Sequence, residues 1–186
     1  MRLAGMGEGS LSDSVLATSA KRIPWLAVNL AAAFVAALVI SRFEAAISQI
    51  VALAVLMPIV ASMGGNAGTQ SLAVAVRALA TRDLGASNAW RVVRREALVG
   101  LLNGLVFAVA TGVVAGLWFG APGIGAVIAI AMVLTLLVAA IGGVLVPLAL
   151  DRAGVDPAIA SGPFVTTITD VVGFFVFLGI ASTVLL

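Results

Sequence analysis

The chain has 186 residues, of which 62% are apolar and only 10% are charged, and its formal net charge is +2. Soluble globular domains carry about 25% charged residues, so this composition excludes a water-soluble domain and predicts an all-α membrane protein. The small net charge gives no reason to expect a nucleic-acid partner, and the absence of cysteine and histidine excludes thiolate and imidazole metal sites.

Five apolar segments follow a mixed N-terminal stretch, residues 1–20, which is interpreted as a residual linker. A membrane-spanning helix needs about 20 apolar residues, and the charge-free stretch between Glu96 and Asp151 is too long for one span. The turn signal Gly120 to Gly123 divides that stretch into two. Residues 21–186 are therefore expected to form one transmembrane domain, with spans at about 23–41, 45–76, 97–119, 124–150 and 157–186.

The basic residues predict the orientation of these five spans. A five-span arrangement places nine of the ten lysines and arginines on one side of the membrane and only Arg42 on the other. Because positive loops stay in the cytoplasm, we expect a cytoplasmic N-terminus and an external C-terminus. The chain is thus predicted to be a multi-pass protein of the cell membrane.

The second segment contains a proline, Pro58, and a glycine-rich run from Met63 to Gln70. Proline removes a backbone donor and glycine loosens the helix, so a kinked or broken helix with exposed carbonyls is predicted here. Asn66 and Gln70 lie one helical turn apart, and together with such carbonyls they would suit a hydrated cation. The alternative is a glycine packing face with two interhelical amide hydrogen bonds.

In the fifth segment, Asp170 is the single charged residue of an otherwise apolar span. Thr166 and Thr167 precede it by one turn, Gly162 by two, and Gly173 follows, so a small polar face is expected around the carboxylate. Carboxylates within membranes usually mark ion pathways, which favours a pore wall. The alternative is an aspartate hydrogen-bonded to the threonines in a dry helix interface.

With these motifs, the sequence resembles the MgtE family of magnesium channels and transporters over about residues 21–186. Several linked motifs occur in the same order and spacing as in the family, which makes the resemblance specific. They are Arg22-Ile23-Pro24-Trp25-Leu26, Gly64-Gly65-Asn66-Ala67-Gly68-Thr69-Gln70-Ser71, Arg77-Ala78-Leu79-Ala80-Thr81, and the run from Asp156-Pro157-Ala158 to Asp170.

The resemblance implies a homodimer of five-helix subunits in the lipid bilayer, with a pore at the dimer axis lined by the second and fifth helices. Asp170 matches the family's central aspartate, which holds a hydrated Mg²⁺, and Asp156 matches an aspartate at the cytoplasmic end that also binds Mg²⁺. Backbone near Gly65 and Gly68 would line the narrow part. Gly162 departs from members that carry a pore-facing asparagine there.

Magnesium transport through this pore is therefore the leading function, with Mg²⁺ as the transported ion. A broader divalent route for Mn²⁺, Co²⁺ or Ca²⁺ and a non-conducting scaffold subunit are the alternatives. An enzyme is not expected, because an intramembrane aspartyl protease needs two acidic groups and one chain offers only Asp170. Full-length relatives carry cytoplasmic Mg²⁺-sensing domains that this sequence lacks, so a truncated form, a fragment or a naturally short member is expected.

Overall fold

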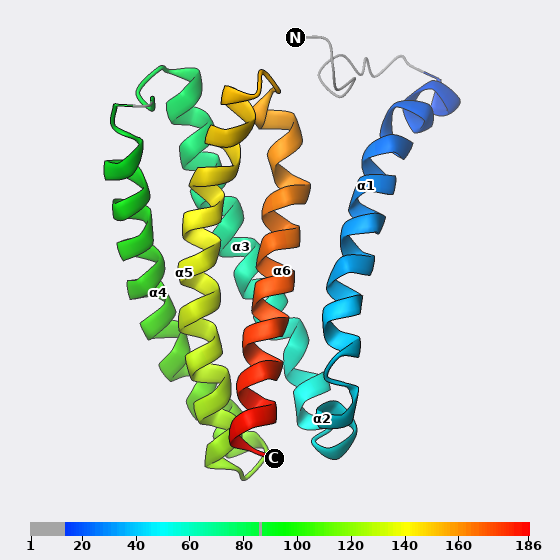
Figure 1. Ribbon diagram of the computed structural model, residues 1–186, viewed down its shortest axis with the longest axis vertical. Helices are drawn as coiled ribbons and strands as arrows, with labels where there is room; N and C mark the ends of the chain where they lie inside the picture. Colours follow the sequence, from blue (N-terminus) through cyan, green and yellow to red (C-terminus); the bar gives the residue numbers. More distant parts are fainter. Residues whose placement is uncertain (1–13, 86) are drawn as a thin grey trace.

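A computed structural model describes residues 14–85 and 87–186, all of which lie in helices or in short connections between them (Figure 1). Long apolar helices form here because a backbone in lipid must satisfy its own hydrogen bonds. The helices are α1 (Val15–Ser41), α2 (Glu44–Gln49), α3 (Ala52–Ala80), α4 (Ala89–Trp118), α5 (Pro122–Arg152) and α6 (Pro157–Val184).

Five of these helices, all except α2, are long and apolar enough to cross a membrane, which confirms the predicted number of spans. They have 27 to 31 residues, so each is longer than the roughly 20 residues that cross the hydrocarbon core. The ends differ from the predicted ones because the helices continue past the apolar segments. Thus α1 begins at Val15 and α4 at Ala89. Residues 1–13 of the predicted linker lie outside the described residues.

The predicted break in the second segment is displaced. The helix is interrupted at Ile50 and Val51, between α2 and α3, whereas Pro58 and the glycine-rich run lie inside the continuous helix α3. The helix is therefore not broken at Pro58, and the predicted kink there stays a prediction. Pro58 is only the seventh residue of α3, so the missing N–H costs one hydrogen bond near the start of a long helix. The glycines allow close packing instead of unwinding the chain.

Helix α5 lies at the centre of the bundle and packs against α3, α4 and α6 (Figure 1). It is the most buried of the five spans, since its small residues let three neighbours approach. Helix α1 stands beside the other four and contacts α6, and Ala36 is its single buried residue. Most of the surface of α1 is therefore not covered by any other part of the chain that the structure describes.

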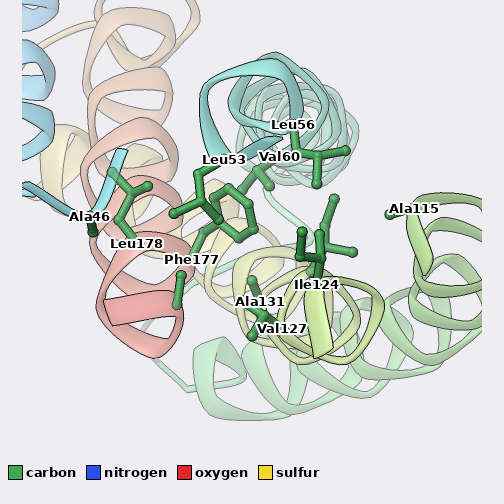
Figure 2. Close-up of a cluster of buried hydrophobic side chains, with 12 residues drawn as sticks. Ala46, Leu53, Leu56, Val60, Ala115, Ile124, Val127, Ala131, Phe177 and Leu178 are labelled. Atoms are coloured by element: carbon green, nitrogen blue, oxygen red, sulfur yellow. The ribbon is translucent and has the colours of Figure 1, made fainter. Parts of the chain in front are cut away.

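The apolar core forms one cluster at each end of the bundle and a third, smaller cluster between them. At the end where α6 finishes, Phe177 of α6 lies against Leu53 and Val60 of α3, and all three are fully buried (Figure 2). At the opposite end, Val144 of α5 packs in a second cluster with Ala75 of α3. Between the two ends, Met132 and Leu136 of α5 form the third cluster with Ala108 of α4. Small and polar residues lie at the nearby contacts of α3 with α5 and α6.

Candidate ion-conducting site

Helix α6 presents a regular buried ridge to its neighbours. The ridge recurs every four residues, and Asp170 directly follows one of its members, Thr169. Asp170 is half-buried and so lies at the edge of the ridge, not within it. The members of the ridge are Ser161, Val165, Thr169, Gly173, Phe177 and Ala181.

The threonines near Asp170 do not bind its carboxylate. The Thr166 hydroxyl donates to the carbonyl oxygen of Gly162 at 3.0 Å, and the Thr167 hydroxyl donates to that of Pro163 at 2.6 Å. Within the residues that the structure describes, the Asp170 carboxylate has no hydrogen-bond or ion-pair partner. The alternative prediction of a carboxylate held by threonines is therefore not supported, and Asp170 remains available to a group outside the subunit.

Helix α3 carries a polar face that no other part of the described chain covers. Asn66 and Gln70 are exposed, and neither amide has a hydrogen-bond partner among residues 14–85 and 87–186. Thr69 is also exposed, and its hydroxyl donates to the carbonyl oxygen of Gly65 at 2.8 Å. A Cβ at Gly65 would meet no atom within 4 Å. The predicted interhelical amide bonds are thus absent within one described subunit.

Other glycines of the two helices face the interior of the subunit. A Cβ at Gly68 would lie 2.7 Å from Val165 Cγ1, and one at Gly64 would lie 2.8 Å from Thr135 Cγ2. Gly173 is buried, and a Cβ there would lie 3.2 Å from Val60 Cγ1. Gly68 and Gly173 therefore pack α3, α5 and α6 together. Their assignment to a pore wall stays a prediction, and only their backbone atoms could line such a wall.

Asp156 caps the start of α6, as its position before Pro157 predicts. Its carboxylate accepts a hydrogen bond of 3.0 Å from the backbone N–H of Ala158, and Pro157 is the first helical residue. Gly162, two turns before Asp170, has open space where a Cβ would lie. Asp156 and Asp170 are 14 positions apart on one helix, which is about 21 Å along its axis. The two carboxylates therefore do not form one site.

The sequence interpretation missed a buried polar pair at the contact of α3 and α4. The Ser71 hydroxyl donates to Glu96 Oε2 at 2.9 Å, and the two residues are 5% and 6% exposed. Glu96 lies just before the predicted third span, which starts at about residue 97, but α4 already begins at Ala89. A signal was present, because Glu96 continues the four-residue spacing of Gly100, Gly104 and Ala108, which form the buried side of α4.

The described chain offers only isolated carboxylates to a metal ion. Among residues 14–85 and 87–186, no three side chains of aspartate, glutamate, histidine or cysteine lie close enough to hold one. Direct coordination of a dehydrated ion by several side chains of a single subunit is therefore not available there. A divalent cation that retains its water shell needs fewer protein ligands.

The chain is similar to known transport proteins along most of its length. A model of the family MgtE, described as divalent cation transporters, matches residues 57–180, which include the polar face of α3 and the whole region around Asp170. This match covers α3 from its second turn to most of α6.

Three curated relatives each carry the name magnesium transporter MgtE. The protein of Enterococcus faecalis is 41% identical over 97% of this chain, that of Bacillus subtilis 39% over 87%, and that of Thermus thermophilus 37% over 88%. The chain spans 36–40% of the length of these relatives. With the family model matching well over half of its residues, the chain belongs to the MgtE family of divalent cation transporters.

Proposed function

We propose that this chain transports Mg²⁺ across the cytoplasmic membrane through a pore at the axis of a homodimer. In this arrangement, the two copies of Asp170 hold one hydrated Mg²⁺. The proposal rests on one observation: Asp170 is a carboxylate inside an apolar helix, and it has no partner in the described subunit. A charge in such a place is costly unless a cavity, a partner or an ion receives it.

The unpartnered polar faces support a second copy of the chain. Asn66 and Gln70 on α3 and Thr166 on α6 are exposed in one subunit, and facing lipid would leave the amides without hydrogen bonds. Helices α3 and α6 pack against each other. In a two-fold dimer, the polar faces of α3 and α6 from both subunits would surround one channel. Such a dimer would also place two copies of Asp170 at that channel.

The chemistry of these faces suits an ion that keeps its water. Mg²⁺ dehydrates reluctantly, and the waters of its shell donate hydrogen bonds outward, so the site must supply acceptors. The Thr166 hydroxyl proton is already committed to the Gly162 carbonyl, which leaves the Thr166 oxygen as an acceptor. The amide oxygens of Asn66 and Gln70 and the Asp170 carboxylates add further acceptors.

Magnesium is preferred over a broader set of divalent ions because all three relatives are named magnesium transporters. In the proposed orientation, Asp156 lies at the cytoplasmic mouth, where its carboxylate would attract cations while capping α6. The chain spans less than half of these relatives, and their remaining length is the proposed place of sensor domains.

The purified chain in proteoliposomes tests the transport proposal. We expect Mg²⁺ uptake that exceeds the uptake of Ca²⁺ and of monovalent ions, measured with ion-specific dyes. Equal uptake of Mn²⁺, Co²⁺ and Ca²⁺ would favour the broader divalent route. No uptake from protein shown to be correctly inserted would favour a scaffold subunit.

Cross-linking tests the dimer separately, on a chain that contains no natural cysteine. Thr166→Cys on the exposed side of α6 should give a cross-linked dimer with a short thiol-specific reagent. Val109→Cys is the matched control, because Val109 is 69% exposed on α4, away from the proposed axis. Equal cross-linking at both positions, or none at Thr166→Cys, would contradict an axis lined by α6.

A further inference from the structure

Three arginines gather on one face of α4, near its beginning. Arg94 and Arg95 follow Arg91 by three and four residues, so the three arginines share one side of the helix with Leu98 and Leu102. All five side chains are exposed. Within residues 14–85 and 87–186, no acidic side chain forms an ion pair with any of the three arginines.

The position of these arginines along α4 corresponds to the headgroup level of a bilayer. Trp90 and Trp118 are 77% and 64% exposed at the two ends of the helix, and tryptophan is enriched at membrane interfaces. They are 28 positions apart, or about 42 Å along the helix, which matches the roughly 40–45 Å between the outer limits of the headgroup regions. The arginines thus lie about 34–40 Å from Trp118.

The apolar part of the same face lies deeper. Leu98 and Leu102 are about 30 Å and 24 Å from Trp118 along the helix, so they reach the hydrocarbon core below the arginines. A shallow hollow of about 380 Å³ runs along this face, and its lining is almost entirely apolar, so the arginines contribute mainly their methylene stems to it. Its lining residues are Arg91, Arg94, Arg95, Leu98, Val99 and Leu102.

We propose that this hollow on α4 binds an anionic phospholipid. The phosphate would lie among the guanidinium groups of Arg91, Arg94 and Arg95, and one acyl chain would follow Leu98 and Leu102. Guanidinium groups match phosphate in charge and in hydrogen-bond geometry. A free phosphate would use only the guanidinium groups, whereas a lipid also covers the leucines.

The charge balance of the hollow favours an anionic headgroup over a zwitterionic one. Three unneutralised positive charges attract a net negative lipid, but a zwitterionic headgroup brings its own cation to the same place. Helix α4 packs mainly on α5, so this face lies away from the α3 and α6 faces assigned to the pore. The lipid site is therefore independent of ion conduction through Asp170.

The test compares lipid retention by the purified chain in detergent, measured by native mass spectrometry with added phosphatidylglycerol or phosphatidylcholine. We expect the chain to retain phosphatidylglycerol at least about tenfold better than phosphatidylcholine. Excess inorganic phosphate should leave the phosphatidylglycerol bound. Combining Arg91→Gln, Arg94→Gln and Arg95→Gln should reduce the affinity for phosphatidylglycerol by about 100-fold, at about fivefold for each arginine.

The matched control removes the same charge elsewhere by combining Arg77→Gln, Arg82→Gln and Arg152→Gln, all at exposed positions. It should retain phosphatidylglycerol nearly as well as the unmodified chain. Equal retention of the two lipids, or equal losses in the two triple variants, would overturn the proposal, as would complete competition by inorganic phosphate. If the α4 triple variant does not fold, each single variant should still show its fivefold loss, and unchanged retention in all three would overturn the proposal.

Discussion

Two carboxylates, Glu96 and Asp170, lie away from the ends of long apolar helices in the described chain, and the protein surrounds them very differently. Glu96 of α4 is 6% exposed and accepts a hydrogen bond from Ser71 of α3. Asp170 of α6 is half-buried and has no partner within the described part of the chain. The comparison separates a carboxylate enclosed by helix packing from one left open at the edge of a packed ridge.

The glycines near the two carboxylates differ in the same way. Next to Ser71, a Cβ at Gly143 would lie 2.7 Å from the backbone oxygen of Gly68 and 2.7 Å from Ser71 Cβ. On the open faces, Gly65 of α3 and Gly162 of α6 have no atom within 4 Å of such a Cβ. Close packing encloses the Glu96 region, whereas the faces that carry Gly65 and Gly162 leave room for another chain.

The largest expected effect is on transport, from Asp170→Asn. This change keeps the size of the side chain and removes both charges of the proposed dimer, so Mg²⁺ uptake in proteoliposomes should fall by at least about tenfold. The thermal midpoint in detergent should stay the same or rise, because the empty carboxylates repel each other. Glu96→Gln is the control, and it should retain uptake.

Normal uptake by Asp170→Asn would show that Asp170 is not the ion site. A loss of uptake caused only by misfolding would likewise indicate a structural role for Asp170. A lowered thermal midpoint would reveal such misfolding. Asp170→Glu retains the charge but makes the side chain longer, so it should impair conduction less than Asp170→Asn impairs selectivity for Mg²⁺ over monovalent ions.

The second effect is on stability and compares two glycines. Gly143→Ala should lower the free energy of unfolding by about 1–3 kcal/mol, because the new methyl group meets backbone atoms that cannot move aside easily. Gly65→Ala should change it by less than about 0.5 kcal/mol, since the site is open. Denaturant titration in detergent measures both, and equal losses would refute the contrast between a closed and an open region.

A third effect concerns the hydrogen bond of Glu96. Glu96→Ala leaves the buried Ser71 hydroxyl without its acceptor, which should cost about 1–3 kcal/mol of unfolding free energy. Glu96→Gln keeps an acceptor and should cost less. Adding Ser71→Ala to Glu96→Ala should recover part of the loss, because no unpaired hydroxyl remains. Strictly additive losses in this double-mutant cycle would argue against a direct Ser71–Glu96 interaction.

The sequence was sufficient to predict the number of spans, because hydropathy alone decides which segments enter a bilayer. It also predicted the Asp156 cap, since the Asp-Pro pair has a local cause. The pattern around Asp170 marked it as unusual from its charge alone. These features depend on neighbouring residues in the chain or on a single side chain in lipid.

Features that depend on contacts between helices were not predictable in the same way. Pro58 and the glycine-rich run suggested a broken helix, but close contacts with Thr135 and Val165 accompany a continuous α3. Glu96 looked like the end of a connection because its partner, Ser71, lies 25 positions earlier in the chain. The positions of both carboxylates were evident, but their surroundings depend on how neighbouring helices pack, as the contact of Glu96 with Ser71 of α3 shows.

The smallest effect concerns Thr135 of α5, which lies between the two regions. Thr135 is 1% exposed, and its hydroxyl has no hydrogen-bond partner among the described residues. Its methyl group lies 2.8 Å from where a Cβ at Gly64 would lie. Thr135→Val keeps the shape and removes the unpaired hydroxyl, so the free energy of unfolding should be unchanged or should rise by up to about 1 kcal/mol. Thr169→Val is the matched comparison, because the Thr169 hydroxyl donates to the Thr166 carbonyl at 2.9 Å, and it should gain nothing. A clear loss of stability in Thr135→Val would show that the hydroxyl is satisfied by water that reaches this level from the open side, and the boundary between the closed and the open region would then lie deeper in the subunit than Asp170.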